Sequence, residues 1–116
     1  MQILHYAKRG KYKPHYDYFL PTEMGSQSAI KSAGQRLATL IMYLNAPEIG
    51  GATSMPTIGL TVSAKKASAI YFENIDSQGK VNPQTLHAGM PCWWVKNGLP
   101  QSAQEEDHYF KFVLLD

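Results

Sequence analysis

The segment Tyr12–Phe19 reads YKPHYDYF and places His15 and Asp17 two residues apart. In a β-strand, residues two apart point to the same face, so an imidazole nitrogen and a carboxylate oxygen can converge on one cation. A second histidine would complete the two-His, one-carboxylate set that holds non-heme Fe(II) and leaves positions open for further ligands. His87 is the candidate for that third position. The alternative for the pair alone is a solvated turn with a local ion pair.

The composition fits a single globular domain of modest size. The chain has 116 residues, of which 44% are hydrophobic and 17% are charged, and its net charge is +2. The single cysteine, Cys92, excludes an intrachain disulfide and a multi-cysteine metal site. It leaves the redox compartment undetermined, so localisation stays open, and so does the oligomeric state.

Two classes of partner are not expected. The basic residues near the N-terminus are typical of a solvated strand edge, and we expect no nucleic-acid partner. These residues are Lys8, Arg9, Lys11 and Lys13. No apolar run approaches the roughly 20 residues that a membrane helix needs, so we expect a soluble protein with no membrane span. Residues 1–6 run straight into charged residues and do not have the form of a secretory signal.

Short apolar segments separated by glycine and proline indicate an all-β fold. We expect strands at 2–7, 57–62 and 67–72, and a last apolar stretch at 86–95 that is interrupted by Pro91. A strand that begins at residue 2 needs partners, which suggests that an N-terminal part is missing.

The remaining segments fit the same class. Residues 35–45 are long enough for a helix or a strand, residues 21–32 are predicted to be a loop, and residues 76–80 a turn. Because no segment has the pattern of a convincing amphipathic helix, we predict an all-β sandwich or jelly roll.

From Ile3 to about Pro91 the chain resembles the catalytic domain of prolyl 4-hydroxylases, which are 2-oxoglutarate and Fe(II)-dependent dioxygenases. The family fold is a double-stranded β-helix of the jelly-roll, cupin-like class, which agrees with the strand-rich interpretation. The segments that carry the resemblance follow one another in the family's order. They are LHY at 4–6, KPHYDYF at 13–19, GQRLAT at 34–39, MYL at 42–44, GGAT at 50–53, Val62 with Lys65 and Lys66, AIYF at 69–72, and LHAGMP at 86–91.

The resemblance implies a set of site residues. It assigns His15, Asp17 and His87 as iron ligands, and no catalytic residue beyond them. Tyr6 matches a tyrosine of the cosubstrate and substrate pocket, and Thr53 matches a threonine that helps to hold the distal carboxylate of 2-oxoglutarate. Each of the remaining matches also has a plainer interpretation, because a strand tyrosine packs and a threonine after Gly-Gly closes a turn. A further match is Arg36, which corresponds to an arginine that grips the peptide substrate and could equally pair with a surface acid.

The implied chemistry is oxidative. The family couples the decarboxylation of 2-oxoglutarate to succinate and CO2 with hydroxylation of peptidyl proline at C4, and the implied cofactors are Fe(II), 2-oxoglutarate and ascorbate. The cofactor carries the hard chemistry, while the protein supplies ligands and orientation and excludes water. The implied partner is a proline-containing peptide or protein.

One family position is not conserved in this chain. The family places a lysine ten residues after the distal histidine, where it pairs with the far carboxylate of 2-oxoglutarate, and here that position is Asn97. Lys96 stands one residue early, and in a regular strand it would point to the face opposite His87. A β-bulge could restore the register.

The genetic code offers an explanation for this difference. Residues 92–98 read CWWVKNG, where the family typically has VLVGEKW. Read from the third base of the Cys92 codon, the first three triplets must encode Leu, Val and Gly, and the next three permit Glu, Lys and Trp. We therefore divide the chain into a prolyl 4-hydroxylase-like core at 1–91 and a divergent, possibly frameshifted tail at 92–116. In that case the N-terminal helices and the last strands of the family fold are expected to be absent. The alternative is a genuinely divergent C-terminus.

Two rival functions remain open. A catalytically inactive β-helix module would bind a metal or a peptide without turnover, and the displaced Lys96 favours it. A cupin-like binder of sugars or small molecules would keep the fold but would leave the matches at Tyr6, Arg36 and Thr53 unexplained.

Overall fold

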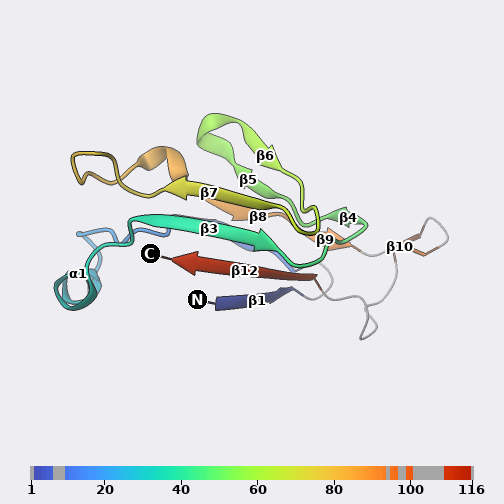
Figure 1. Ribbon diagram of the computed structural model, residues 1–116, viewed down its shortest axis with the longest axis horizontal. Coiled ribbons are helices and arrows are strands. Elements are labelled where there is room, and N and C mark those ends of the chain that lie inside the picture. Colours follow the sequence, from blue (N-terminus) through green and yellow to red (C-terminus); the bar gives the residue numbers. More distant parts are fainter. Residues whose placement is uncertain (1, 7–9, 94, 97–98, 101–108, 116) are drawn as a thin grey trace.

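The computed structural model arranges the chain as antiparallel β-sheets (Figure 1). It describes residues 2–6, 10–93, 95–96, 99–100 and 109–115. One four-stranded sheet has the spatial order β1 (Gln2–Tyr6), β12 (Tyr109–Leu115), β3 (Ala38–Tyr43), β7 (Ala69–Glu73). The other has the order β2 (Tyr12–His15), β8 (His87–Gly89), β5 (Thr53–Met55), β6 (Leu60–Val62).

Short elements connect and extend these sheets. The two-stranded pairs are β4 (Ile49–Gly50) with β9 (Cys92–Trp93), and β10 (Val95–Lys96) with β11 (Leu99–Pro100). The helical elements are α1 (Ser26–Ala33) and the 3-10 turns η1 (Pro56–Ile58) and η2 (Pro83–Thr85). Within the described residues, no helix has the length and apolar character that a membrane crossing requires.

Side chains that alternate along the strands form the core between the two four-stranded sheets. Along β3 every second residue is buried, from Thr39 to Tyr43, as period-2 alternation requires. The buried apolar cluster draws on β3, β7, β5 and β9, and its members are Ile41, Tyr43, Met55, Phe72 and Cys92. This arrangement is a double-stranded β-helix and confirms the predicted fold class.

The structure differs from the sequence prediction at α1, which occupies a segment that was predicted to be a loop. Its residues, SQSAIKSA, are polar enough to hide a helical period, and Ser26 is the one buried residue among them. Gly34 ends the helix with its N–H donated to the Ile30 carbonyl at 2.9 Å and a positive φ of 82°, the conformation that glycine adopts readily.

The end of the chain contributes a strand to the fold. β12 lies in the middle of a sheet, paired with β1 on one side and with β3 on the other (Figure 1). The segment YFKFVLL is rich in aromatic and branched residues, which favour strands. The first and last described strands are therefore neighbours.

The β4–β9 pair ties Cys92 to the rest of the fold. Gly50 lies opposite Cys92, and the Gly51 N–H donates to the Pro91 carbonyl at 3.0 Å. Gly50 has a φ of 79°, and a Cβ built there would overlap the backbone oxygen of Pro91. Only glycine fits this close approach of two chain segments.

We expect Gly50→Ala to lower the free energy of unfolding by about 2 to 5 kcal/mol, the sum of left-handed strain and overpacking. Gly59→Ala is the matched control, because Gly59 has a φ of 64° but nothing within 4 Å of the added Cβ. That control should lose only about 1 to 2 kcal/mol. Urea denaturation of both variants measures the difference, and equal losses would contradict the close contact at Pro91.

Candidate metal centre

Two histidines lie directly opposite each other on neighbouring strands. His15 ends β2 and His87 begins β8, and the two are cross-strand partners in the antiparallel pair. Residues at such positions have closely spaced Cβ atoms. The imidazole rings accordingly lie 4.4 Å apart between centroids. His87 is buried, whereas the His15 side chain is 31% exposed, so the pair opens to solvent on the His15 side.

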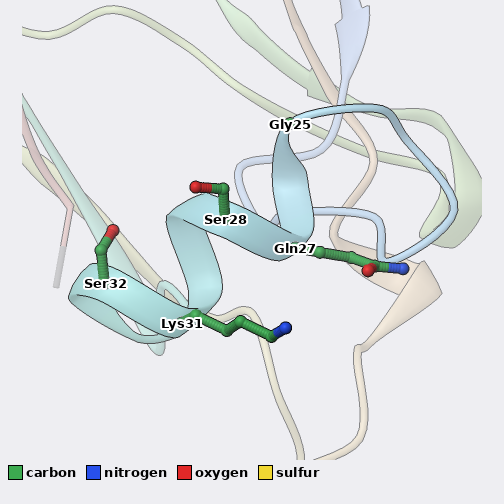
Figure 2. Close-up of a pocket in the computed structure, with 5 residues that line it drawn as sticks. All are labelled: Gly25, Gln27, Ser28, Lys31 and Ser32. Atoms are coloured by element: carbon green, nitrogen blue, oxygen red, sulfur yellow. The ribbon is translucent and has the colours of Figure 1, made fainter.

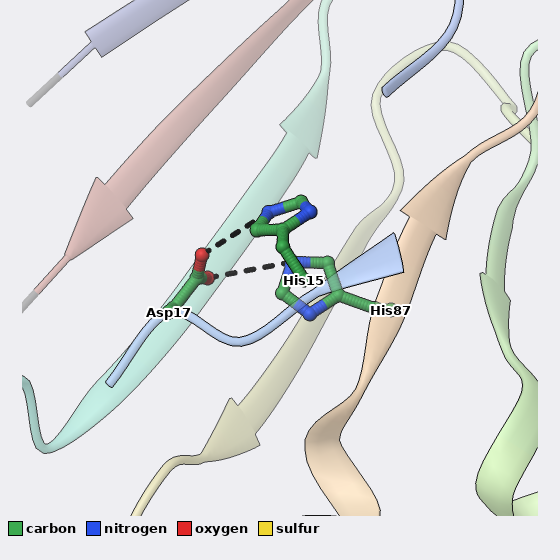
Figure 3. A group of neighbouring side chains, drawn as sticks. All are labelled: His15, Asp17 and His87. Atoms are coloured by element: carbon green, nitrogen blue, oxygen red, sulfur yellow. Dashed lines mark ion pairs between the residues drawn. The ribbon is translucent and has the colours of Figure 1, made fainter. Parts of the chain in front are cut away.

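Asp17 completes the group (Figure 3). Its Oδ1 lies 3.4 Å from His15 Nε2, and its Oδ2 lies 3.5 Å from His87 Nε2. One ligand atom from each of the three residues lies within 4.8 Å of the others, and the described part of the chain contains no second such group. Asp17 does not share a strand with His15, as the sequence interpretation assumed, because β2 ends at His15 and the chain bends at Asp17. The bend, rather than strand alternation, turns the carboxylate toward the imidazoles.

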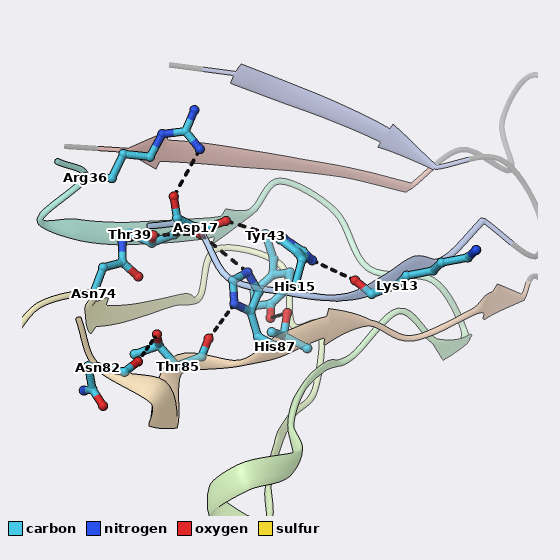
Figure 4. Close-up of polar contacts among 11 residues, drawn as sticks. Lys13, His15, Asp17, Arg36, Thr39, Tyr43, Asn74, Asn82, Thr85 and His87 are labelled. Carbon is cyan, nitrogen blue, oxygen red and sulfur yellow. Dashed lines mark hydrogen bonds and ion pairs between the residues drawn. The ribbon is translucent and has the colours of Figure 1, made fainter. Parts of the chain in front are cut away.

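Backbone carbonyls fix the orientation of both imidazoles (Figure 4). His15 Nδ1 lies 2.7 Å from the Lys13 carbonyl oxygen, and His87 Nδ1 lies 2.8 Å from the Thr85 carbonyl oxygen. A carbonyl oxygen can only accept, so each Nδ1 carries a proton and donates it. In the neutral imidazole the lone pair is then on Nε2, the ring nitrogen that faces Asp17, and this is the tautomer of a histidine that ligates a metal through Nε2.

The electrostatics of the group call for a cation. Burial raises the pKa of the Asp17 carboxyl, but the contacts with His15 and His87 and the hydrogen bond from Thr39 outweigh it and lower the pKa below its ordinary value. Asp17 is therefore ionised at neutral pH. The imidazoles supply the positive charge and the hydrogen bond that favour the carboxylate, and a metal cation bound among the three side chains would take over that role by replacing the Nε2 protons. This donor set suits Fe(II), and the residues present fit the ion that the sequence interpretation assigned to them.

Hydrogen bonds from the opposite sheet hold the Asp17 carboxylate. The Thr39 hydroxyl on β3 donates to Asp17 Oδ2 at 2.7 Å, and Asn74 Nδ2, just after β7, donates to Thr39 Oγ1 at 2.9 Å. Both residues are fully buried. Sequence reasoning assigned neither of them to the site. The inward alternation along residues 39–43 is the signal that points to Thr39, but no local pattern points to Asn74.

Arg36 contacts the backbone of the metal group in addition to the role in peptide binding that the resemblance implies. Its Nη1 donates to the Asp17 backbone carbonyl at 3.2 Å, and its guanidinium stacks 4.6 Å above the Phe19 ring. Gln35 beside it binds the Phe19 backbone through both its amide nitrogen and its amide oxygen. These contacts fasten the bend that carries Asp17 to the start of β3.

Thr53 points into the core from β5. It is fully buried, and its hydroxyl lies 2.6 Å from the Tyr43 phenol oxygen on β3. Burial raises the pKa of Tyr43, although its hydrogen bond with Thr53 opposes the shift. The pair joins the two sheets, and the sequence interpretation missed Tyr43 as a site residue.

The two other cosubstrate positions are placed only in part. Tyr6 ends β1, and Lys96 ends β10, but the side chains of both lie outside the described part of the structure. Asn97 lies outside the described residues altogether. The strand of His87 ends at Gly89, and β10 pairs with β11 instead, so the face of Lys96 cannot be counted along one regular strand from His87.

Hollows also lie on the surface of the described residues, beside His87 and along α1. An apolar groove between β6 and β7 shares Phe72 and Thr85 with the surroundings of His87. A shallow depression follows α1 (Figure 2) and is lined by Gly25, Gln27, Ser28, Lys31 and Ser32. This depression contains none of the residues that the sequence interpretation assigned to the site.

Comparisons with known proteins agree with this geometry. The family model of the 2OG-Fe(II) oxygenase superfamily matches residues 1–96. Prolyl 4-hydroxylase subunit alpha-2 of Gallus gallus is 36% identical over 101 residues, which cover 84% of this chain and 18% of the relative. Prolyl 4-hydroxylase 5 of Arabidopsis thaliana is 36% identical over 110 residues, covering 78% of this chain and 36% of the relative.

A solved structure supports the same relationship. The viral collagen prolyl hydroxylase of Paramecium Bursaria Chlorella virus-1, in its 2OG complex, is 29% identical and superposes with a TM-score of 0.70. The match covers 97% of this chain and 55% of that structure. The chain thus spans about half of the solved relative and a smaller part of the two curated ones. It belongs to the 2OG-Fe(II) oxygenase superfamily, within the prolyl 4-hydroxylase family.

Proposed function

We propose that this chain is the core of a 2-oxoglutarate and Fe(II)-dependent dioxygenase that hydroxylates peptidyl proline at C4 and releases succinate and CO2. The observation that carries the proposal is the convergence of His15, Asp17 and His87, with both imidazole Nδ1 protons committed to backbone carbonyls. This arrangement directs both Nε2 atoms toward the Asp17 carboxylate, which is the orientation that two histidines and one carboxylate need in order to bind one iron ion.

The three ligand candidates have different roles in such a site. His15, Asp17 and His87 hold the ion and leave its other positions exchangeable. When bound, Fe(II) supplies the chemistry that couples 2-oxoglutarate and dioxygen to hydroxylation. Asp17 and His87 are buried and exclude water on one side, while the partly exposed His15 lies on the side that reactants can approach.

We assign the cosubstrate to the interior between the two sheets. Thr53 provides a hydroxyl for the distal carboxylate of 2-oxoglutarate, and its contact with Tyr43 orients that hydroxyl. Tyr6 is the further pocket residue carried over from the family. Lys96 is the nearest basic residue to the position where the family has its lysine.

The substrate is a proline-containing peptide or protein, held in part by Arg36. The stacking of Arg36 on Phe19 and its bond to the Asp17 carbonyl support a role that joins substrate grip to ligand placement. Ascorbate serves as the reductant that keeps the iron in its ferrous state.

A second function is a module that binds a metal or a peptide without turnover. The position of Lys96 favours it, because β10 pairs with β11 and not with the sheet that carries His87. Without a lysine at the far carboxylate, 2-oxoglutarate would lose an ion pair while the metal group stays intact.

Incubation of the chain with Fe(II), ascorbate, 2-oxoglutarate and a proline-rich peptide should yield succinate and hydroxyproline. Asp17→Asn should abolish turnover and weaken metal binding by at least about 100-fold, because a neutral amide replaces the anionic ligand. Glu23→Gln, which removes an exposed acid, is the matched control and should leave both unchanged. If the unmodified chain binds metal but forms no succinate, the module without turnover is correct.

Thr53→Val should raise the KM for 2-oxoglutarate by about 10- to 100-fold, since it removes one hydrogen bond to a carboxylate worth about 1.5 to 3 kcal/mol. Thr53→Ser keeps the hydroxyl and should stay near the unmodified value. Steady-state rates of succinate formation at varied 2-oxoglutarate concentrations give the KM of each variant. A KM for Thr53→Val equal to that of the unmodified chain would remove Thr53 from the cosubstrate site.

We also propose that residues 92–116 are read from a shifted frame. The codons permitted by CWWVKNG support this, because the alternate frame restores the family's lysine at the place of Asn97. Sequencing the coding DNA across Pro91 should give Leu-Val-Gly-Glu-Lys-Trp in that frame. Any other translation there would establish a divergent C-terminus in place of the shift.

A further inference from the structure

A chain of two hydrogen bonds reaches the metal group from the sheet opposite its histidines. It runs from the Asn74 amide to the Thr39 hydroxyl and on to the Asp17 carboxylate, and we refer to it as the Asn74–Thr39 relay (Figure 4). All three side chains are buried, with Asn74 and Thr39 at 0% exposure and Asp17 at 8%. Water therefore cannot replace either donor without a change in the packing.

The direction of each proton in the relay is fixed by chemistry. The Asp17 carboxylate can only accept, so the Thr39 hydroxyl donates its single proton to Oδ2. Thr39 Oγ1 must then accept from Asn74, which requires the amide nitrogen, not the amide oxygen, to face it. The opposite amide orientation would leave two acceptors facing each other.

This orientation leaves a buried group without a partner. Asn74 Oδ1 has no hydrogen-bond partner among the described residues. An unsatisfied buried acceptor costs free energy, and native proteins keep few of them. A leucine or a methionine would fill this place without that cost. The presence of an asparagine at this buried place is explained if the hydrogen bond that it donates to Thr39 helps to hold the metal group.

The relay also fits the register of the two sheets. Thr39 on β3 is the cross-strand partner of Phe72 on β7, whose ring lies 4.9 Å from that of His87. One cross-strand pair, Thr39 and Phe72, thus faces the other pair, His15 and His87. The hydroxyl of the first pair holds the carboxylate, and its aromatic ring packs against one imidazole.

We propose that Thr39 and Asn74 are positioning residues that set the orientation of the Asp17 carboxylate for metal binding. This inference rests on the metal site proposed above. Asn74 acts through Thr39, because its side-chain amide donates to the Thr39 hydroxyl. Thr39 acts through Asp17, because its hydroxyl donates to Asp17 Oδ2.

Titration of the full chain with Co(II) tests the relay without turnover, since the visible absorption of the bound ion reports both affinity and ligand geometry. Thr39→Val should weaken Co(II) binding by about 10- to 100-fold and alter the spectrum, as expected when a ligand loses its outer partner. Thr39→Ser restores the hydroxyl and should bind within about threefold of the unmodified chain.

Ile41→Val is the matched control. Ile41 is buried on the same face of the same strand, two residues from Thr39, and loses one methylene without touching Asp17. It should lower the melting temperature but leave the Co(II) affinity and spectrum unchanged. A loss of affinity in Ile41→Val equal to that in Thr39→Val would make the effect one of general stability and overturn the proposal.

A double-mutant cycle tests the order of the relay. Asn74→Ala should weaken Co(II) binding, and the double variant with Thr39→Val should be no worse than Thr39→Val alone, because the first group acts only through the second. Losses that multiply would refute the relay. If Thr39→Val does not fold, Asn74→Ala decides alone, and unchanged binding overturns the proposal. Failure of the unmodified chain to bind Co(II) would remove the metal site itself, which is a different result from binding that Thr39→Val leaves intact.

Discussion

The burial of the Asp17 carboxylate is the constraint on which the rest of the site depends. A charge that is removed from water must be paired and hydrogen-bonded, or its pKa shifts until it is neutral. Here the pairing comes from two sheets at once, with imidazoles from β2 and β8 and a hydroxyl from β3. The favourable contacts prevail over desolvation. The carboxylate thus couples the relative position of the sheets to the geometry of the ligands.

This constraint gives the interior an unusual character for so small a fold. Among the described residues, buried polar side chains are about as numerous as buried apolar ones, and several of them meet between the sheets. Such a core relies on complete satisfaction of its polar groups, because partly satisfied networks cost stability. A bound ion would complete the network at Asp17. It would stabilise the folded state by about 2.7 kcal/mol at a concentration of 100 times its Kd.

The fold class and the grouping of His15, Asp17 and His87 could be predicted from the sequence, but the geometry of that group could not. Short strands between glycines indicate a jelly roll, and the segments around His15 and His87 carry a family pattern. The convergence of Asp17 depends on a bend. The inward alternation along residues 39–43 points to Thr39, but Asn74 lies 57 positions from Asp17 and no local pattern reveals it. α1 escaped prediction because serine-rich residues leave little apolar period.

The sequence requirements of a β-strand at the end of the chain are looser than those of a binding site for 2-oxoglutarate. A strand in a sheet needs extended backbone and suitable side-chain bulk, and many sequences satisfy both. β12 can therefore pair with β1 and β3 whether or not its residues descend from the family's last strand. An ion pair with a carboxylate needs one cation at one position, and a shift of a single residue removes it. Pairing in the sheet around Thr39 is therefore compatible with a changed tail, whereas the proposed anchoring of 2-oxoglutarate by a lysine within residues 92–116 depends on a single position.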